Sequence, residues 1–465
     1  MMGTRRECIN GTVRGVLDDG IASFKGIPYT GEPPVGKNRW MPPVPYGIAD
    51  RFIDADSFAA SPPQRSNGKF PTNEDCLRLN IWVNTKDETE RKPVILWIHG
   101  GFYTAGSTSH PMYSGMNFVR ESPDIIFVSA GYRLGALGFM DVSAIPGGED
   151  LDDSANLGIM DLGMALKWVY ENIGSFGGDR ENITLMGQSA GAACATLLAS
   201  NEEYGRMVRR VIAESGSPSF SNGVGLSPQV GAYIAKKLGC TDMDGMRSIP
   251  SEILGELSES LSMKVWPIRN GKTVPKDPYK ELGKRRIDIL AGSNLNEMET
   301  FAASMGKDVL LDTTRRTVSS LPEKEKRIAT EFLGSGDDLG KYIILANGSL
   351  FSAPAEMLAL QATMSGGKGY RYVWTAETGR PGYGAYHGAE MPAILMNRPN
   401  KQTREISLEA HRMWAFFARN GVPSEDWPVC EEEDRAFMTI GEAGFKASRE
   451  SLPEIIRGFE GKYLL

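Results

Sequence analysis

One serine in this chain stands between two glycines, in the stretch Gly187-Gln-Ser189-Ala-Gly191. The apolar run before it, at 183–186, is typical of a buried strand, and the small-residue run from 192 to 198 is typical of a helix. A sharp turn from strand to helix brings the two backbones close together, and glycine two residues either side of the serine avoids a clash. The motif therefore predicts an exposed serine nucleophile; the alternative is a glycine–serine turn without a catalytic role.

A serine hydroxyl is a weak nucleophile until a base accepts its proton, and histidine is the usual base. The chain has four histidines. His411 lies in a helical pattern, His110 lies in a loop beside a proline, and His99 opens a glycine-rich stretch that suits a different task. Elimination leaves His387, in a glycine-bearing segment after an apolar run at 370–374, as the expected base.

The third group needed is an acid that holds the imidazole in the correct tautomer and stabilises its positive charge. On the type of fold that carries this serine motif, the order along the chain is serine, acid, histidine. The segment after an apolar run at 287–290 contains Glu297 and Glu299. We expect Glu297 to be the acid, with Asn296 and Glu299 as polar neighbours that have no part in the chemistry.

Acyl transfer also passes through an oxyanion, which backbone N–H groups stabilise when nothing blocks their approach. Gly100 and Gly101 follow a strand-like run and suit that purpose, and the N–H of Ala190 lies next to the nucleophile. A glycine turn that only reverses the chain is the alternative, and it is disfavoured beside the other two motifs.

Short apolar runs rich in β-branched and aromatic residues recur along the chain and are typical of strands buried on both faces. They lie at 94–98, 125–129, 183–186, 211–213, 287–290 and 370–374. Helical patterns separate several of them, as at 157–173. This alternation predicts an α/β fold with a mainly parallel central sheet and helices on both faces. We expect a single catalytic domain over 1–465, with helical insertions at about 219–263 and 308–360 that cover the site.

Composition excludes several other classes of protein. The 465 residues carry a net charge of −7 with the basic residues scattered, which argues against a nucleic-acid surface. No continuously apolar stretch approaches the roughly 18 residues of a membrane span. The five cysteines have no metal-binding or disulfide spacing, and we expect no cofactor and no metal. These features favour a cytoplasmic protein.

Several longer blocks resemble one family, the type-B carboxylesterases, which includes bacterial para-nitrobenzyl esterases and the cholinesterases. The blocks are FKGIPYTGEPPVGKNRWMPP, NEDCLRLNIW, WIHGGF, GYRLGALGF, NLGIMDLGMALKWVYENIGSFGGDRENITLMGQSAGA, AESGSP, GSNLNEME, HGAE and ARNGVPSEDWP. They cover essentially the whole chain in order. The resemblance implies an α/β-hydrolase fold and assigns the triad to Ser189, Glu297 and His387, the residues chosen above on chemical grounds.

Two departures from the family pattern concern the site. The family motif usually has glutamate before the nucleophile, whereas this chain has Gln188, so affinity for cationic substrates is not expected. The family uses the second and third positions after the His99 equivalent as oxyanion donors, which implies Gly101 and Phe102 here. Phenylalanine replaces the usual glycine or alanine, and we expect its ring to narrow the acyl or alcohol pocket. Trp266, Phe301 and Tyr383 are candidates to line the site or to be core residues.

A third departure concerns the family disulfide. Cys76 matches a family cysteine whose partner position looks like Ser61 here, so that bridge cannot form. The segment 62–73 between them lacks the tryptophan of the cholinesterases, which argues against a cholinesterase.

The resemblance and the motifs favour cleavage of small-molecule carboxylic esters through an acyl-enzyme. An amidase, a lactonase or an acyltransferase would use the same groups. A non-catalytic cholinesterase-like binding protein is disfavoured because all triad positions are filled. The sequence leaves the oligomeric state open.

Overall fold

The computed structural model describes residues 2–48, 51–65, 70–87, 90–225, 227–319, 321, 323–336, 338–377, 382–397, 403–450 and 452–462. One 13-stranded sheet runs through the molecule in the order β1-β2-β3-β5-β7-β6-β8-β9-β10-β11-β12-β13, with β4 paired to β2. The strands are β1 (Met2–Cys8), β2 (Gly11–Asp18), β3 (Ile21–Pro28), β4 (Phe52–Asp54), β5 (Arg78–Asn84), β6 (Lys92–Ile98), β7 (Ile126–Ala130), β8 (Gly178–Gln188), β9 (Arg210–Glu214), β10 (Asp288–Asn294), β11 (Gly369–Trp374), β12 (Phe437–Gly441) and β13 (Gly444–Ser448).

The centre of this sheet is parallel. Strands β7, β6, β8, β9, β10, β11 and β12 pair in parallel in that order. Strands β1, β2, β3 and β5 add an antiparallel edge on one side, and β13 adds one on the other. The predicted strands are confirmed, but β8 and β10 are longer than their apolar cores, because ladder hydrogen bonds extend them to Gln188 and Asn294.

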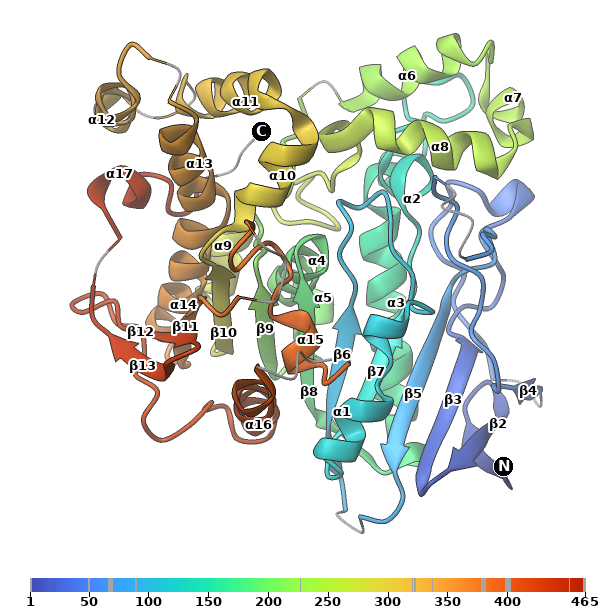
Figure 1. The fold of residues 1–465 in the computed structure, drawn as a ribbon. Coiled ribbons are helices and arrows are strands. Elements are labelled where there is room, and N and C mark those ends of the chain that lie inside the picture. The colour runs from blue at the N-terminus through green and yellow to red at the C-terminus, as the bar shows by residue number, and fades with distance from the viewer. Residues whose placement is uncertain are drawn as a thin grey trace.

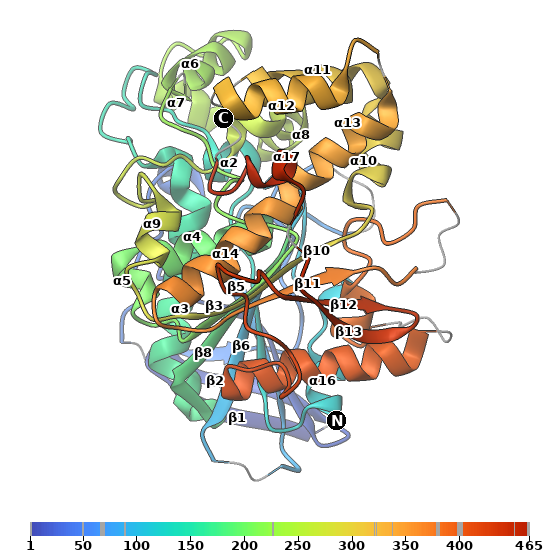
Figure 2. The same ribbon diagram turned by 90° about the vertical axis from the view of Figure 1, so that its left-hand side faces the viewer.

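Helices cover both faces of the sheet, as Figures 1 and 2 show. Helices α3 (Leu157–Asn172), α4 (Ala190–Ser200), α5 (Glu202–Gly205), α9 (Pro278–Leu282) and α14 (Ala353–Met364) lie on one face. Helices α1 (Met116–Glu121), α15 (Met391–Ile394) and α16 (Arg404–Asn420) lie on the other, which faces the viewer in Figure 1. The expected α/β architecture with a mainly parallel sheet is therefore confirmed.

Further helices gather at the end of the sheet where the parallel strands finish (Figure 1). They are α2 (Gly135–Phe139), α6 (Ser227–Lys237), α7 (Met243–Ser248), α8 (Ser251–Leu261), α10 (Glu297–Met305), α11 (Lys307–Ser319), α12 (Glu323–Leu333), α13 (Leu339–Asn347) and α17 (Glu454–Arg457). Most of them fall in the two segments that were expected to be helical. This end of the sheet also carries the predicted site residues.

One helical run needs a correction to the sequence analysis. Residues Leu339–Met364 are long and apolar enough to cross a membrane, whereas no such stretch was expected. Polar residues interrupt the run, so it is not continuously apolar in the sequence although its mean hydropathy is high. In the structure 67% of its most apolar window is buried, and its second half, α14, packs on β10 and β11. The run therefore packs as a helix of the protein core.

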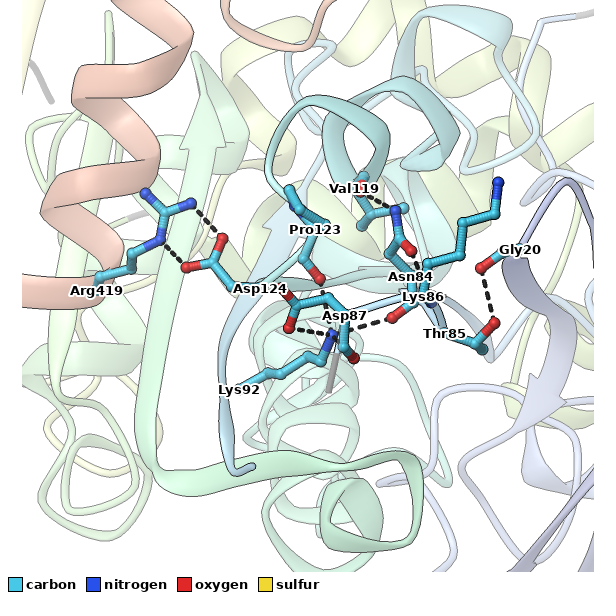
Figure 3. A network of polar contacts seen from close by, with 10 residues as sticks. All are labelled: Gly20, Asn84, Thr85, Lys86, Asp87, Lys92, Val119, Pro123, Asp124 and Arg419. Carbon is cyan, nitrogen blue, oxygen red and sulfur yellow. Dashed lines mark hydrogen bonds and ion pairs between the residues drawn. The ribbon is translucent and has the colours of Figure 1, made fainter. Parts of the chain in front are cut away.

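The opposite end of the sheet is held by a buried lysine, shown in Figure 3. Lys92 Nζ donates to the carbonyl oxygens of Asn84 at 3.0 Å, Asp87 at 3.0 Å and Pro123 at 2.8 Å. The ammonium also pairs with the Asp87 carboxylate at 3.1 Å. An ammonium has three protons to donate, so these carbonyls satisfy it fully and tie the β5–β6 connection to the loop before β7.

Candidate active site

The predicted nucleophile lies at the turn between β8 and α4. Ser189 has φ 59° and ψ −127°, a conformation that L side chains rarely adopt. A Cβ at Gly187 would lie 2.4 Å from the carbonyl carbon of Gly191, and a Cβ at Gly191 would lie 2.1 Å from Ile98 O. The structure thus confirms why both flanking residues are glycine. The Ser189 N–H donates to Glu214 O at 2.8 Å, which holds the turn to the neighbouring strand.

The predicted acid and base lie in contact. Glu297 is the first residue of α10 and is fully buried. Its Oε1 accepts from the Asn294 N–H at 2.7 Å, and its Oε2 is 2.7 Å from His387 Nδ1. The His387 side chain is 13% exposed, so one end of the ring can meet a substrate. The carboxylate fixes the Nδ1–H tautomer and leaves Nε2 as the acceptor.

Asn296, which the sequence analysis set aside, joins the segments that carry the acid and the base. Its N–H donates to Ala385 O at 3.0 Å, and its Oδ1 accepts from the Ala385 N–H at 3.1 Å. Asn294 adds a bond from Nδ2 to Tyr386 O at 2.8 Å. The asparagines on either side of Leu295 therefore set the position of the histidine loop, which their sequence alone does not reveal.

Ser189 and His387 are not hydrogen-bonded to each other in the structure as described. Instead, the side-chain amide of Gln188 donates from Nε2 to His387 Nε2 at 3.1 Å. The residue that departs from the family motif thus contacts the predicted base directly.

The N–H groups expected to bind an oxyanion are free of protein partners. Within the described hydrogen bonds, none has the N–H of Gly100, Gly101, Phe102 or Ala190 as its donor. Gly101 has φ 115° and its carbonyl accepts from Thr104 and Ala105, which folds this loop back on itself. Gly100 lies against the nucleophile, because a Cβ there would be 3.1 Å from Ser189 Cβ. Unpaired N–H groups beside a nucleophile are what an oxyanion hole requires.

The other three histidines have structural contacts. His99 is buried, stacks on Tyr132 at 4.7 Å, and contacts Gly100 O through Nδ1 at 2.9 Å. His411 is buried in α16 between Ser122 and Ile394 O. Burial lowers the pKa of each of these two rings to about 4, so both are neutral near pH 7. His110 accepts from the Met112 N–H and ends a loop.

Aromatic rings form a closed circuit that includes the predicted base. The successive ring-to-ring distances are Phe102–Phe301 5.8 Å, Phe301–His387 5.0 Å, His387–Phe351 5.2 Å, Phe351–Phe220 5.8 Å, Phe220–Trp266 5.5 Å and Trp266–Phe102 5.9 Å. Two of the proposed lining residues, Trp266 and Phe301, belong to this circuit. Phe102 is the most exposed ring of this circuit, at 37%. Tyr383 lies outside the circuit.

Two buried carboxyl groups behind the acid were missed by the sequence analysis. Glu214 on β9, Gly292 on β10 and Tyr372 on β11 lie side by side in register, and Gly292 leaves the Tyr372 ring room to lie over it. Burial raises the pKa of Glu214 well above its ordinary value, and the charge of Glu390 raises it further. Burial, and then the charge of Glu297, raise the pKa of Glu390 to about 7. The quoted blocks AESGSP and HGAE contain both glutamates, but only the fold brings them together.

All five cysteines are free thiols. Cys76 is buried, and the matching of Ser61 to a family cysteine position remains a prediction from the resemblance.

Comparisons with known proteins show which family this chain resembles. The model of the carboxylesterase family matches residues 4–453. The chain is 30% identical to phenmedipham hydrolase from Pseudarthrobacter oxydans over 95% of each protein, and 30% identical to the para-nitrobenzyl esterase of Bacillus subtilis over 92% of this chain and 93% of that protein. A carboxylesterase structure from Geobacillus stearothermophilus matches with a TM-score of 0.87 at 30% identity, over 98% of this chain and 100% of that chain.

The chain therefore has the α/β-hydrolase fold and belongs to the carboxylesterase family. It is a carboxylic ester hydrolase, and the resemblance stated from the sequence blocks is confirmed.

Proposed function

We propose that this chain hydrolyses small carboxylic esters through an acyl-enzyme on Ser189, with His387 as the base and Glu297 as the acid that orients it. The observation that carries the assignment is the 2.7 Å contact between Glu297 and His387, at the end of the sheet where the serine turn lies. Three residues far apart in the sequence were chosen on chemical grounds, and two of them share a hydrogen bond.

In the proposed reaction, Ser189 Oγ attacks the ester carbonyl while its proton passes to His387 Nε2. The carbonyl oxygen becomes an oxyanion, which accepts from the N–H groups of the Gly100–Phe102 loop and of Ala190. The protonated imidazole then returns its proton to the departing alcohol oxygen. Water attacks the acyl-enzyme by the same route and releases the acid, leaving Ser189 and the neutral imidazole restored.

The surroundings favour uncharged, apolar esters. The aromatic circuit supplies apolar surface beside His387, and Gln188 brings no negative charge to attract a cationic alcohol group. The five free thiols also support the proposed cytoplasmic location.

The test is burst-phase hydrolysis of para-nitrophenyl acetate, butyrate and octanoate. Wild type is expected to release about one para-nitrophenolate per active site before the steady state, because acylation by an activated ester outpaces water attack and the acyl-enzyme accumulates. Ser189→Ala is expected to lose the burst and to lose turnover by on the order of 10³-fold or more. The matched control is Ser200→Ala at the far end of α4, whose hydroxyl donates to Leu197 O at 2.7 Å, and which should keep the burst.

Retention of wild-type turnover by Ser189→Ala would refute the assignment of the nucleophile. A wild type inert to all three esters would point to a narrow substrate range or to a binding role. Parallel assays with a para-nitroanilide, a lactone and an added alcohol acceptor separate ester hydrolysis from the amidase, lactonase and acyltransferase alternatives.

A further inference from the structure

The side chain of Gln188 lies between the oxyanion loop and the base. It is 96% buried, since only 4% of the residue is exposed. Its Oε1 lies 3.2 Å from the position that a Cβ at Gly100 would take, and its Nε2 is 3.1 Å from His387 Nε2. Gly388 follows the base with φ 81°, and Gln188 Nε2 lies 3.6 Å from the position of a Cβ there. The absence of a side chain at Gly100 leaves space for the amide, while a Cβ at Gly388 would only be in ordinary van der Waals contact with it.

The amide competes with the nucleophile for one lone pair. His387 Nδ1 is engaged by Glu297, so Nε2 of the neutral ring carries the one lone pair that remains for a donor. In the structure that lone pair accepts from the Gln188 amide. Ser189 Oγ must take the same position before its proton can be transferred.

His387 does not need this contact to keep its orientation. The Glu297 carboxylate holds one edge of the ring, and the rings of Phe301 and Phe351 lie 5.0 Å and 5.2 Å from it. The main effect of the Gln188 amide is therefore to restrict access to His387 Nε2. Its effect on the position of the imidazole ring is expected to be smaller.

We propose that Gln188 is a positioning residue that holds the resting base in an occupied state, with its amide on His387 Nε2, and that it must withdraw before Ser189 can be activated. This inference rests on the proposed role of Ser189 and His387. A neutral hydrogen bond contributes about 0.5–1.5 kcal/mol net, so removing it should accelerate acylation about 2- to 10-fold.

The same contact predicts how the base responds to a charge at position 188. Among the described residues, two acidic groups face His387: Glu297 on α10 and Glu390 at the start of α15. The other described side chains around the ring are uncharged. They are Phe301 on α10, Phe351 in the segment before α14, and Gln188 at the end of β8. A carboxylate in place of the amide would accept from the protonated ring and stabilise it. Gln188→Glu should therefore move the acid limb of the kcat/KM profile to higher pH, by about 1–3 pH units.

The experiment measures the burst rate constant with para-nitrophenyl butyrate, together with pH profiles of kcat/KM. Gln188→Met keeps the side-chain length but removes the donor, and it is expected to acylate about 2- to 10-fold faster than wild type on the pH plateau. Gln361→Met, on α14 and outside the site, is the matched control and should acylate at the wild-type rate. Gln188→Glu is a conservative replacement that restores the residue usual in the family. Its readout is the position of the acid limb in the pH profile of kcat/KM.

Faster acylation by Gln188→Met and a displaced acid limb for Gln188→Glu would support the proposal. Acylation by Gln188→Met at or below the wild-type rate, with the profile of Gln188→Glu unmoved, would overturn it. Ser189→Ala distinguishes the two levels of inference. A burst that disappears in Ser189→Ala while Gln188→Met is no faster leaves the nucleophile in place and refutes the role of Gln188 alone.

Discussion

Replacing Glu390 with glutamine should flatten the pH dependence of stability. Glu390 is fully buried at the start of α15, with one carboxylate oxygen on the Asn294 amide and the other without a partner in the described part of the chain. Burial and the charge of Glu297 raise its pKa from 4.5 to about 7. Between these two pH values the unfolded chain has released the proton and the folded protein keeps it. The free energy of unfolding therefore falls as pH rises through this window and is level above it.

The size of the effect follows from the pKa difference. A shift from 4.5 to about 7 corresponds to ~3 kcal/mol, at 1.36 kcal/mol for each pH unit. Because the entropy of unfolding is about 2.1 cal/mol/K per residue, a chain of 465 residues has ~1 kcal/mol/K in total. The contribution of Glu390 should therefore lower the melting temperature by ~3 °C between pH 5 and pH 8.

Differential scanning calorimetry at pH 5, 6, 7 and 8 measures this directly. Ionisable groups remote from Glu390 act alike in both proteins, so the difference between Glu390→Gln and wild type reports this carboxyl together with its charge interactions with Glu214 and Glu297. The difference should shift in favour of the variant by ~3 °C from pH 5 to pH 8. Glu409→Gln, an exposed carboxyl on α16, should follow wild type throughout. An unchanged difference between variant and wild type across this range would refute the claim that Glu390 retains its proton on folding.

Two further predictions concern the opposite ends of the sheet. Phe102→Ala should raise the ratio of kcat/KM for para-nitrophenyl octanoate to kcat/KM for the acetate by up to about 10-fold. The reason is that the Phe102 ring contacts Trp266 and Phe301 and restricts the space beside the base. An unchanged ratio would show that the ring does not limit the length of the acyl chain. Lys92→Met should lower the free energy of unfolding by roughly 3 kcal/mol, because three carbonyl oxygens and the Asp87 carboxylate lose the Lys92 ammonium. Activity per folded molecule should stay at the wild-type value. Calorimetry and active-site titration check it, and a loss of activity without a loss of stability would contradict it.

The sequence was most informative where local chemistry constrains residue type. The glycines around Ser189 follow from steric limits at one turn, and the apolar runs define the parallel strands, so both were predictable. Glu297 and His387 were found because the order of the triad along the chain is restricted and histidines are few. Each of these inferences needs only a short stretch of sequence.

Contacts across the sheet were beyond the same reasoning. Glu214 and Tyr372 approach each other only because the register of β9, β10 and β11 places Gly292 between them. The amide of Gln188 reaches His387 across 199 positions of the chain, and no local pattern encodes the direction of that side chain. Helix was expected over most of 339–364, but the apolar character of this run was overlooked because its apolar residues are not continuous in the sequence.

The conformation of Ser189 also has a consequence for how stability and catalysis are related. A residue at φ 59° with a side chain costs about 1–3 kcal/mol relative to a relaxed backbone, and the surrounding contacts hold it there. That cost is incurred once, when the chain folds, so no backbone reorganisation energy is added to each turnover. Glycine at this position would relieve the strain but would remove the hydroxyl. At this one residue the most stable sequence and the reactive sequence are therefore different, and selection for stability alone would eliminate the nucleophile.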